Sequence, residues 1–390
     1  GQGGFFPMNY HINTKCLYGN HDKSPVDNTG AISFPIYQTA TFAHPDVGSS
    51  TGYDYSRLQN PTREQLEKVV ASLENGIDAV AFSSGMAAMN ALMELFQPGD
   101  HILASNDLYG GTIRIFNQIN KKNGIEVTYL DTSDADLVEN SIKNNTKAIF
   151  VETPTNPMMN ITDLGAIARI AKSHQLLFLV DNTFLSPYFQ NPIDFGADVV
   201  LHSGTKFLGG HNDTLAGFLV LASTSLSEQI RFILKTTGSG LAPFDSWLLL
   251  RGIKTLAIRM EAQQKNAIAI AEWLKNQDKI RSIYYVGLPS HPGYEVNLRQ
   301  SRGFGSMISF HVDTPATAFR ILRKVNLIQY AESLGGVESL ITYPMLQTHA
   351  DVPVEEREAK GINDTLLRFS VGIEKVEDLI ADLAQALEEK

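Results

Sequence analysis

A lysine near the middle of the chain stands in a setting that suits covalent chemistry. Lys206 ends segment 199–206, which reads VVLHSGTK, and FLGG follows it. An amine buried at the end of an apolar strand is costly unless it is paired or used, and burial lowers its pKa toward the range that a Schiff-base lysine needs. For a lysine considered alone, a surface position in a glycine-rich turn is the stronger interpretation.

A carboxylate in a matching position changes that balance. Asp181 directly follows the apolar segment 176–180, LLFLV, and so stands at another predicted strand end. A buried carboxylate there can pair with the pyridinium nitrogen of pyridoxal phosphate, which makes the ring a strong electron sink. An aspartate that caps the following turn is the alternative. Together, Lys206 and Asp181 predict a site for pyridoxal 5'-phosphate.

Three loops offer further cofactor contacts. SSGM at 83–86 joins a predicted strand to a predicted helix, where free backbone N–H groups bind phosphate, although ordinary serine capping is an alternative. Tyr109 lies in a loop after another strand, where its ring could stack on the cofactor or pack on the surface. Asn156 could reach a ring oxygen with its amide, or form a routine Asn-Pro turn.

The elements around these loops predict an α/β fold. Short apolar segments alternate with helical periodicity, including a helix over 161–171 with Asn160 as its cap. Such alternation indicates a mostly parallel sheet covered by helices on both faces, with ligands at the carboxyl ends of the strands. The segments that we expect to be strands are 125–130, 148–151, 176–180, 199–201 and 218–221.

The length of 390 residues favours more than one domain. Residues 8–60 lack sustained periodicity and predict an extended arm; the residues before Met8 are interpreted as a cloning remnant. Residues 61–243 form the predicted cofactor-binding α/β domain. From 244 the pattern changes to a long helical segment reaching about 275, strand patterns at 307–312 and 366–371, and amphipathic helices. We therefore expect a smaller α+β domain over 244–390.

Composition bears on partners and location. Lys and Arg number 32 against 42 Asp and Glu, a net charge of −10, so neither nucleic acid nor a membrane surface is an expected partner. Cys16 is the only cysteine, which excludes an internal disulfide and fits a reducing cytoplasm. The sequence has no secretory signal pattern and no uninterrupted apolar stretch of about 18 residues.

Other classes of protein are weaker interpretations. His202 and His211 do not have the spacing of a metal hydrolase, and no metal is expected. Segment 238–240, GSG, lacks the third glycine of a dinucleotide-binding loop. A catalytically silent protein that kept the fold is the non-enzyme alternative.

Taken as an ordered set, the motifs resemble the Cys/Met-metabolism family of pyridoxal-phosphate enzymes, with the resemblance running from about residue 29 to the C-terminus. The motifs are YSR at 55–57, NPTR at 60–63, SGMAA at 84–88, DLYGGT at 107–112, ETPTNP at 152–157, VDNTF at 180–184, SGTK at 203–206 and AESLGG at 331–336. The resemblance implies fold-type I, the fold of many pyridoxal-phosphate transferases.

The resemblance also implies roles for individual residues. Lys206 would hold the cofactor as a Schiff base and act in catalysis together with Tyr109, whose ring would stack on the cofactor. Asp181 would pair with the pyridine nitrogen. The phosphate would be held by Gly85, Met86, Ser203 and Thr205, and by Tyr55 and Arg57 reaching in from the neighbouring subunit. The active unit would then be a homodimer, usually within a tetramer.

The same resemblance implies how an amino-acid substrate is held. Arg368 would clamp the α-carboxylate with Asn156 and Ser333, a task that suits the planar guanidinium fork. A solvated strand residue is the alternative for Arg368, and a plain surface charge is the alternative for Arg57. Glu332 stands where relatives that handle cystathionine keep an acid, and it could hold the distal ammonium of cysteine or cystathionine; a solvated glutamate is its alternative.

Two comparisons within the family narrow the reaction. Gly111 replaces the cysteine usual in methionine γ-lyases. The segments PFDS at 243–246, HNDTLAG at 211–217, TYP at 342–344 and QTH at 347–349 are closer to γ-synthases and O-acylhomoserine thiol-lyases than to lyases. We therefore expect trans-sulfuration chemistry by γ-replacement, in which O-acylhomoserine reacts with cysteine to give cystathionine. The alternatives are elimination from cystathionine, as in γ- and β-lyases, and sulfhydrylation of O-acylhomoserine.

Overall fold

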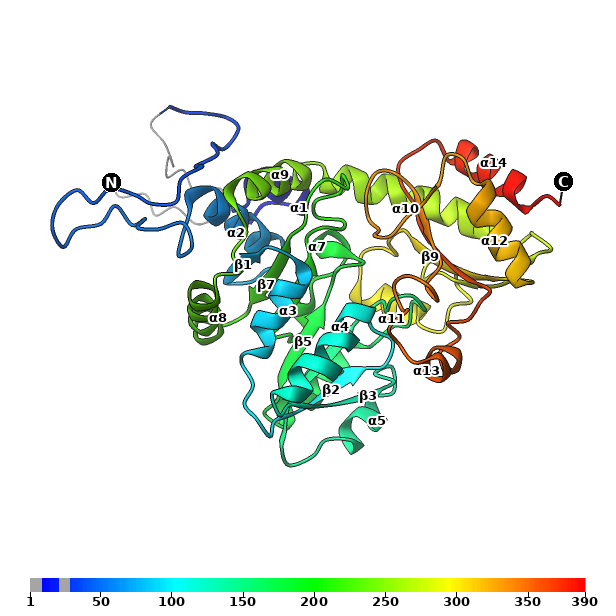
Figure 1. Ribbon diagram of the computed structural model, residues 1–390, viewed down its shortest axis with the longest axis horizontal. Helices are drawn as coiled ribbons and strands as arrows, with labels where there is room; N and C mark the ends of the chain where they lie inside the picture. Colours follow the sequence, from blue (N-terminus) through cyan, green and yellow to red (C-terminus); the bar gives the residue numbers. More distant parts are fainter. Residues whose placement is uncertain (1–8, 21–28, 390) are drawn as a thin grey trace.

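A seven-stranded sheet forms the centre of the molecule in the computed structural model, which describes residues 9–20 and 29–389 (Figure 1). Met8 and the residues before it lie outside the described residues. The strand order is β1-β7-β6-β5-β4-β2-β3. The strands are β1 (Asp78–Phe82), β2 (His101–Ser105), β3 (Glu126–Leu130), β4 (Thr146–Glu152), β5 (Leu177–Asp181), β6 (Val199–Ser203) and β7 (Gly217–Leu221).

Most neighbouring strands in this sheet are parallel, which confirms the predicted sheet type. Only β7 runs antiparallel to its neighbours, β1 and β6. Helices pack on both faces because alternate side chains of the apolar strands point to opposite sides. α3 (Gly85–Met93) and α8 (Thr224–Thr237) share one apolar core with the sheet, and α2 (Pro61–Leu73) and α6 (Leu164–Ser173) share another.

The start of α6 differs from the prediction. Asn160 is not its cap; the carboxylate of Asp163 caps the helix by accepting the N–H of Ala166 at 3.0 Å. The residues before Asp163 are held to the preceding loop, because Asn160 N–H donates to Thr155 Oγ1 at 2.9 Å and Thr162 N–H donates to the hydroxyl of Thr153 at 3.1 Å. The carbonyl of Asn160 in turn accepts the N–H of Thr155 at 3.0 Å, so it bonds to the preceding loop and not to the first turn of a helix.

A second, five-stranded sheet follows in the order β10-β11-β12-β9-β8, with only β10 and β11 parallel. Its strands are β8 (Ile280–Tyr284), β9 (Met307–Val312), β10 (Gln329–Tyr330), β11 (Leu340–Thr342) and β12 (Leu366–Ser370). α12 (Pro315–Lys324) and α14 (Val376–Leu387) complete its apolar core. The α/β fold with a smaller C-terminal α+β part is therefore confirmed, whereas the boundaries at 60 and 243 stay predictions.

The predicted long helix after residue 244 is two helices, α9 (Pro243–Ile253) and α10 (Leu256–Leu274). α10 contacts α1 on one side and α14, β8 and β9 on the other, so it joins the two sheets (Figure 1). The remaining helical segments are α4 (Gly110–Arg114), η1 (Ile115–Asn120), α5 (Ala135–Asn140), α7 (Ser186–Phe189), η2 (Pro192–Phe195), α11 (Tyr294–Gln300) and α13 (Val354–Ala359).

The predicted arm is extended only in part. Residues 12–18 form helix α1 (Ile12–Tyr18), because the buried side chain of Cys16 packs into the core beside α2. Residues 29–60 contain no helix, and the blue segment before α2 extends away from the body in Figure 1. Among the helices of the described residues, none is long and apolar enough to cross a membrane.

Candidate active site

Lys206 lies just beyond β6 at the carboxyl end of the large sheet. Its Nζ donates a hydrogen bond to Ser333 Oγ at 2.9 Å, and Gly210 N–H binds its carbonyl at 2.8 Å. Burial, and to a lesser degree the positive charge of Arg368, lower the pKa of Lys206 to about 8, against an opposing effect of Glu332. The neutral amine that a nucleophilic lysine requires is therefore far more populated near neutral pH than in an ordinary lysine.

Asp181 ends β5, the strand next to β6. Its Oδ1 accepts both the N–H and the hydroxyl of Thr183, at 3.0 and 2.6 Å, and neither bond uses Oδ2. Burial raises the pKa of Asp181, whereas the bonds from Thr183 lower it. Turn capping thus uses Oδ1 of Asp181 and leaves Oδ2 outside these two bonds.

The N-terminus of α3 lies against the end of β6. Ser84 Oγ caps the helix by accepting the N–H of Ala87 at 3.0 Å. A Cβ on Gly85 would stand 3.1 Å from Ser203 Cβ, so a larger residue would crowd this junction. The Thr205 hydroxyl accepts the N–H of Ala216 at 3.1 Å. The site therefore offers a helix N-terminus and hydroxyl groups, which suit a phosphate.

Tyr109 directly precedes α4 and is 38% exposed, so its ring is not part of the core. A Cβ on Gly111 would stand 2.5 Å from Tyr109 Cε1 and 3.1 Å from Met86 Sδ. The tyrosine ring, the glycine and the methionine are thus in close contact. The backbone N–H of Tyr109 donates to Glu152 Oε2 at 3.3 Å.

Arg368 is 1% exposed in β12, so the alternative of a solvated strand residue is wrong. Its guanidinium donates to Asn156 Oδ1 and to the carbonyl oxygen of Ser333, both at 3.1 Å, and to Thr342 Oγ1 at 3.4 Å. Its Nε has no partner. Within the described part of the chain, no carboxylate lies within ion-pair distance of Arg368. Burial lowers its pKa to about 10, which still leaves it charged at neutral pH.

The Ser333 loop approaches Lys206 closely. Ser333 has φ of 82°, a left-handed conformation that non-glycine residues rarely adopt outside strained functional segments. A Cβ on Gly335, where φ is 87°, would come 2.8 Å from the carbonyl carbon of Lys206. Gln263 holds this loop by donating to the carbonyl of Gly336 at 3.0 Å.

A cavity of about 860 Å³ opens beside this loop. Thr205, Glu332 and Ser333 belong to its wall, so the cavity reaches both flanks of Lys206. Glu332 is exposed there, which leaves the solvated alternative for it standing. In the described residues, no group of three or more His, Cys, Asp or Glu side chains is arranged to hold a metal ion.

Tyr55 and Arg57 are not brought to this site within one chain. The Arg57 guanidinium lies over the Tyr55 ring, 5.3 Å from its centroid, and donates to the carbonyl oxygen of Lys235. Both side chains are exposed.

The chemistry of the site fits pyridoxal phosphate. Lys206 supplies an amine of lowered pKa, Asp181 supplies a carboxylate whose Oδ2 takes no part in the bonds to Thr183, and the N-terminus of α3 lies at the same strand ends. Sequence reasoning gave no role to Glu152, although it ends β4 as Asp181 ends β5. The signal that selected Asp181, a carboxylate directly after an apolar strand, could also have found Glu152. Sequence reasoning also missed the contact between Thr342 and Arg368, for which the sequence gives no signal.

Comparisons with known proteins identify the family. Residues 13–388 match the family described as "Cys/Met metabolism PLP-dependent enzyme". Cystathionine γ-lyase of Bacillus subtilis is 51% identical over 93% of this chain and 96% of its own length. Cystathionine γ-synthase/O-acetylhomoserine (thiol)-lyase of the same organism is 47% identical over 97% of each chain.

A solved structure extends the agreement to the fold. Cystathionine γ-lyase from Lactobacillus plantarum, complexed with L-serine, superposes with a TM-score of 0.93 at 44% identity, covering 97% of this chain and 98% of that one. The resemblance of the motifs is thereby confirmed, and so is pyridoxal 5'-phosphate as the cofactor. The chain belongs to the Cys/Met metabolism family of pyridoxal-phosphate-dependent enzymes.

Proposed function

We propose that this trans-sulfuration enzyme catalyses γ-replacement on an O-acylated homoserine. The Cγ–O bond breaks and the acyl group departs as its carboxylate, while the sulfur of cysteine, or of sulfide, forms the new bond to Cγ and gives up its proton. The product with cysteine is cystathionine. The observation that supports an amino-acid substrate is the setting of Arg368, a buried cation whose three protein contacts are all to neutral oxygens.

Arg368 has the chemistry to bind the substrate α-carboxylate. A buried charge without a counter-ion is costly, and a carboxylate arriving in the fork of the guanidinium offsets that cost through charge-assisted hydrogen bonds. Asn156 and Ser333 orient the fork from two sides. Binding there would place the substrate Cα near the amine of Lys206, because Ser333 contacts both residues.

In this proposal Lys206 holds the cofactor covalently and Asp181 pairs with its pyridine nitrogen. Bound pyridoxal phosphate supplies an electron sink that acidifies the proton on the substrate Cα. The Lys206 amine, freed by the substrate, removes the Cα proton and later moves a proton at Cβ. Its lowered pKa suits that task, because a base works best when its pKa lies near the working pH. Tyr109 would assist as a second acid or base.

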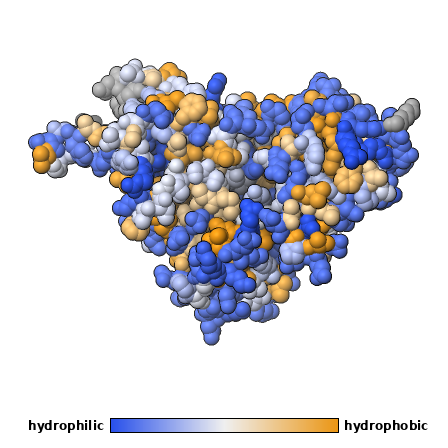
Figure 2. Space-filling model, viewed as in Figure 1, coloured by the Kyte–Doolittle hydropathy of each residue, from blue (hydrophilic) through white to orange (hydrophobic). Residues whose placement is uncertain are grey.

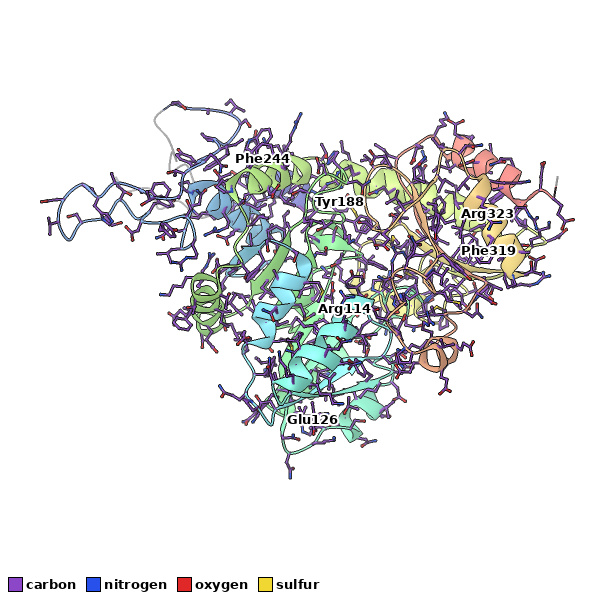
Figure 3. The ribbon with its side chains drawn as sticks, viewed as in Figure 1. Arg114, Glu126, Tyr188, Phe244, Phe319 and Arg323 are labelled. Carbon is purple, nitrogen blue, oxygen red and sulfur yellow. The ribbon has the colours of Figure 1, made fainter. Side chains whose placement is uncertain are left out.

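The phosphate site in this proposal is shared by two copies of the chain. Gly85, Met86, Ser203 and Thr205 would hold the phosphate from one subunit, with Tyr55 and Arg57 reaching in from the other. The arm supports such an assembly because it exposes apolar side chains, with Ile32 at 96% and Val47 at 98%. Figure 2 shows apolar surface on the arm, and Phe244 on nearby α9, labelled in Figure 3, is 53% exposed.

Three observations bear on the choice of reaction, two from the structure and one from a relative. The cavity beside Ser333 has room for a second amino acid, and Glu332 on its wall can receive the ammonium group of cysteine. The crowding at Gly111 opposes a cysteine at the position where methionine γ-lyases carry one. A relative of 47% identity is described as a γ-synthase that also acts as a thiol-lyase.

Elimination from cystathionine is the second candidate, favoured by the 51% identical relative described as a cystathionine γ-lyase. A substrate panel separates the two. Purified protein is assayed with O-acetyl- or O-succinylhomoserine plus cysteine or sulfide, and with cystathionine alone. Higher kcat/KM for the acylhomoserine reactions is expected; faster turnover of cystathionine alone would overturn the assignment.

Glu332→Gln refines this assay. The variant is expected to raise KM for cysteine while leaving KM for the acylhomoserine unchanged. Glu338→Gln is the matched control, because Glu338 lies on the same cavity wall but accepts a hydrogen bond from Asn212 at 2.8 Å.

A separate experiment tests whether the protein is a catalytically silent member of the fold. Borohydride should abolish the visible absorbance of the parent protein and fix the cofactor to Lys206. In Lys206→Ala, neither the loss of absorbance nor the fixed cofactor is expected.

A further inference from the structure

Glu152 is a buried carboxyl group to which the proposed mechanism gives no role. It is the last residue of β4, is 5% exposed, and is the register partner of Asp181 on β5. Paired residues on neighbouring parallel strands point to the same side of a sheet. The two carboxyl groups therefore lie on one face at the same edge, the edge where Lys206 emerges.

Glu152 binds the backbone of two candidate site residues. Its Oε2 accepts the N–H of Tyr109 at 3.3 Å, and the backbone N–H of Asn156 lies near enough to the same carboxyl group to lower its pKa. Tyr109 directly precedes α4, in a loop with no side-chain cap, and Asn156 lies in the loop after β4. One side chain thus ties together two loops that leave the sheet from different strands.

We propose that Glu152 is a positioning residue, which fixes the backbones of Tyr109 and Asn156 at the edge of the cofactor site. The inference rests on the proposed function, because these two residues act on cofactor and substrate only in that proposal. Lost anchoring would let the tyrosine ring move relative to the cofactor and would loosen the amide that contacts Arg368.

The charge state of Glu152 completes the argument. Burial raises the pKa of Glu152 well above the ordinary value, and the nearby carboxylates Asp181 and Asp107 also raise it, whereas the backbone N–H groups of Tyr109 and Asn156 lower it. The raised pKa favours the neutral form of this carboxyl group. A neutral group keeps its acceptor oxygen for Tyr109 while leaving Asp181 as the charged partner for a pyridinium nitrogen.

Two substitutions separate anchoring from mere packing. Glu152→Met keeps the side-chain volume but removes the acceptor, whereas Glu152→Gln keeps a neutral acceptor of the same shape. Asp382→Leu is the matched control, because Asp382 is a buried carboxylate in α14 that accepts the N–H groups of Asn326, Leu327 and Ile328 in the smaller sheet region. Each variant is purified with its cofactor bound.

The readouts are cofactor loss into a trapping reagent, visible circular dichroism of the bound cofactor, and the thermal midpoint. Glu152→Met is expected to lose cofactor about tenfold faster than the parent and to change the visible dichroism, because two donors lose their partner. Glu152→Gln should match the parent within about twofold, with an unchanged pH midpoint of visible absorbance. Asp382→Leu should lower the thermal midpoint alone.

Three results would overturn the inference: Glu152→Met behaving like Asp382→Leu, Glu152→Gln losing cofactor as fast as Glu152→Met, or a shifted pH midpoint in Glu152→Gln. If Glu152→Met does not fold, the inference is judged by the rate of cofactor loss and the pH midpoint of Glu152→Gln. No substrate is present in these measurements. A parent enzyme that prefers cystathionine would therefore overturn γ-replacement and leave the result for Glu152 standing.

Discussion

Lys206 and Ser333 are joined by a hydrogen bond of 2.9 Å although 127 positions separate them in the chain. Lys206 follows a strand of the large sheet, whereas Ser333 lies in a loop of the smaller one, and the carbonyl of Ser333 also accepts from Arg368. The amine and the buried cation are therefore held together by one residue of the C-terminal part. Docking of the two sheets is what completes the candidate site.

The lowered pKa of Lys206 predicts how cofactor capture depends on pH. Only the neutral amine attacks an aldehyde, so the rate at which cofactor-free protein binds pyridoxal phosphate should rise with pH to a midpoint near 8. Arg368→Met should move the midpoint upward, because a nearby positive charge is removed, and Arg368→Lys should not. Rapid-mixing absorbance measures the rate; a midpoint at the ordinary lysine value of 10.5 would contradict the prediction.

Substitution of Arg368 tests the carboxylate clamp. Arg368→Lys keeps the charge but loses the planar fork, and kcat/KM is expected to fall about 10- to 100-fold, mostly through KM. Steady-state kinetics on the preferred substrate provide the check. Arg323→Lys is the control, because Arg323 is an exposed residue of α12 that contacts the Phe319 ring at 5.7 Å (Figure 3). Equal losses in both variants would argue against the clamp.

Gly111→Cys should disturb the Tyr109 ring. The new Cβ would come 2.5 Å from that ring, and overpacking of this kind costs about 1–3 kcal/mol of stability. We expect a lower thermal midpoint, a changed visible spectrum and reduced kcat. Gly165→Ala in α6 is the control, because a Cβ there would have contacts no closer than 3.4 Å. Unchanged spectrum and kcat in Gly111→Cys would mean that the ring moves without consequence.

A shared active site predicts complementation between defective subunits. Co-expressed Arg57→Ala and Lys206→Ala chains would form dimers with one intact site, and up to about a quarter of the parent activity should return with random pairing. Co-expressed Arg368→Met and Lys206→Ala chains are the control, because both residues act within one subunit and no intact site can form. Recovery in neither mixture would exclude a shared phosphate site.

Local sequence patterns were enough to place Lys206 and Asp181 at the ends of two strands of the sheet. Apolar segments of strand length alternate with helices, and such alternation has one common solution, a parallel sheet with its ligand at the strand ends. Lys206 and Asp181 follow two of these strands, which the structure pairs as neighbours. Helix starts were less certain: Asp163, rather than the predicted Asn160, caps α6.

Only the tertiary structure decided which distant residues meet. The pattern around Arg368 allowed a solvated strand residue, and its burial became visible only when the second sheet was in place. The pairing of Glu152 with Asp181 likewise depends on the register between β4 and β5. Sequence patterns report the solvent-facing or apolar character of each segment, whereas contacts across a fold depend on how whole elements pack, and packing is a property of the complete chain.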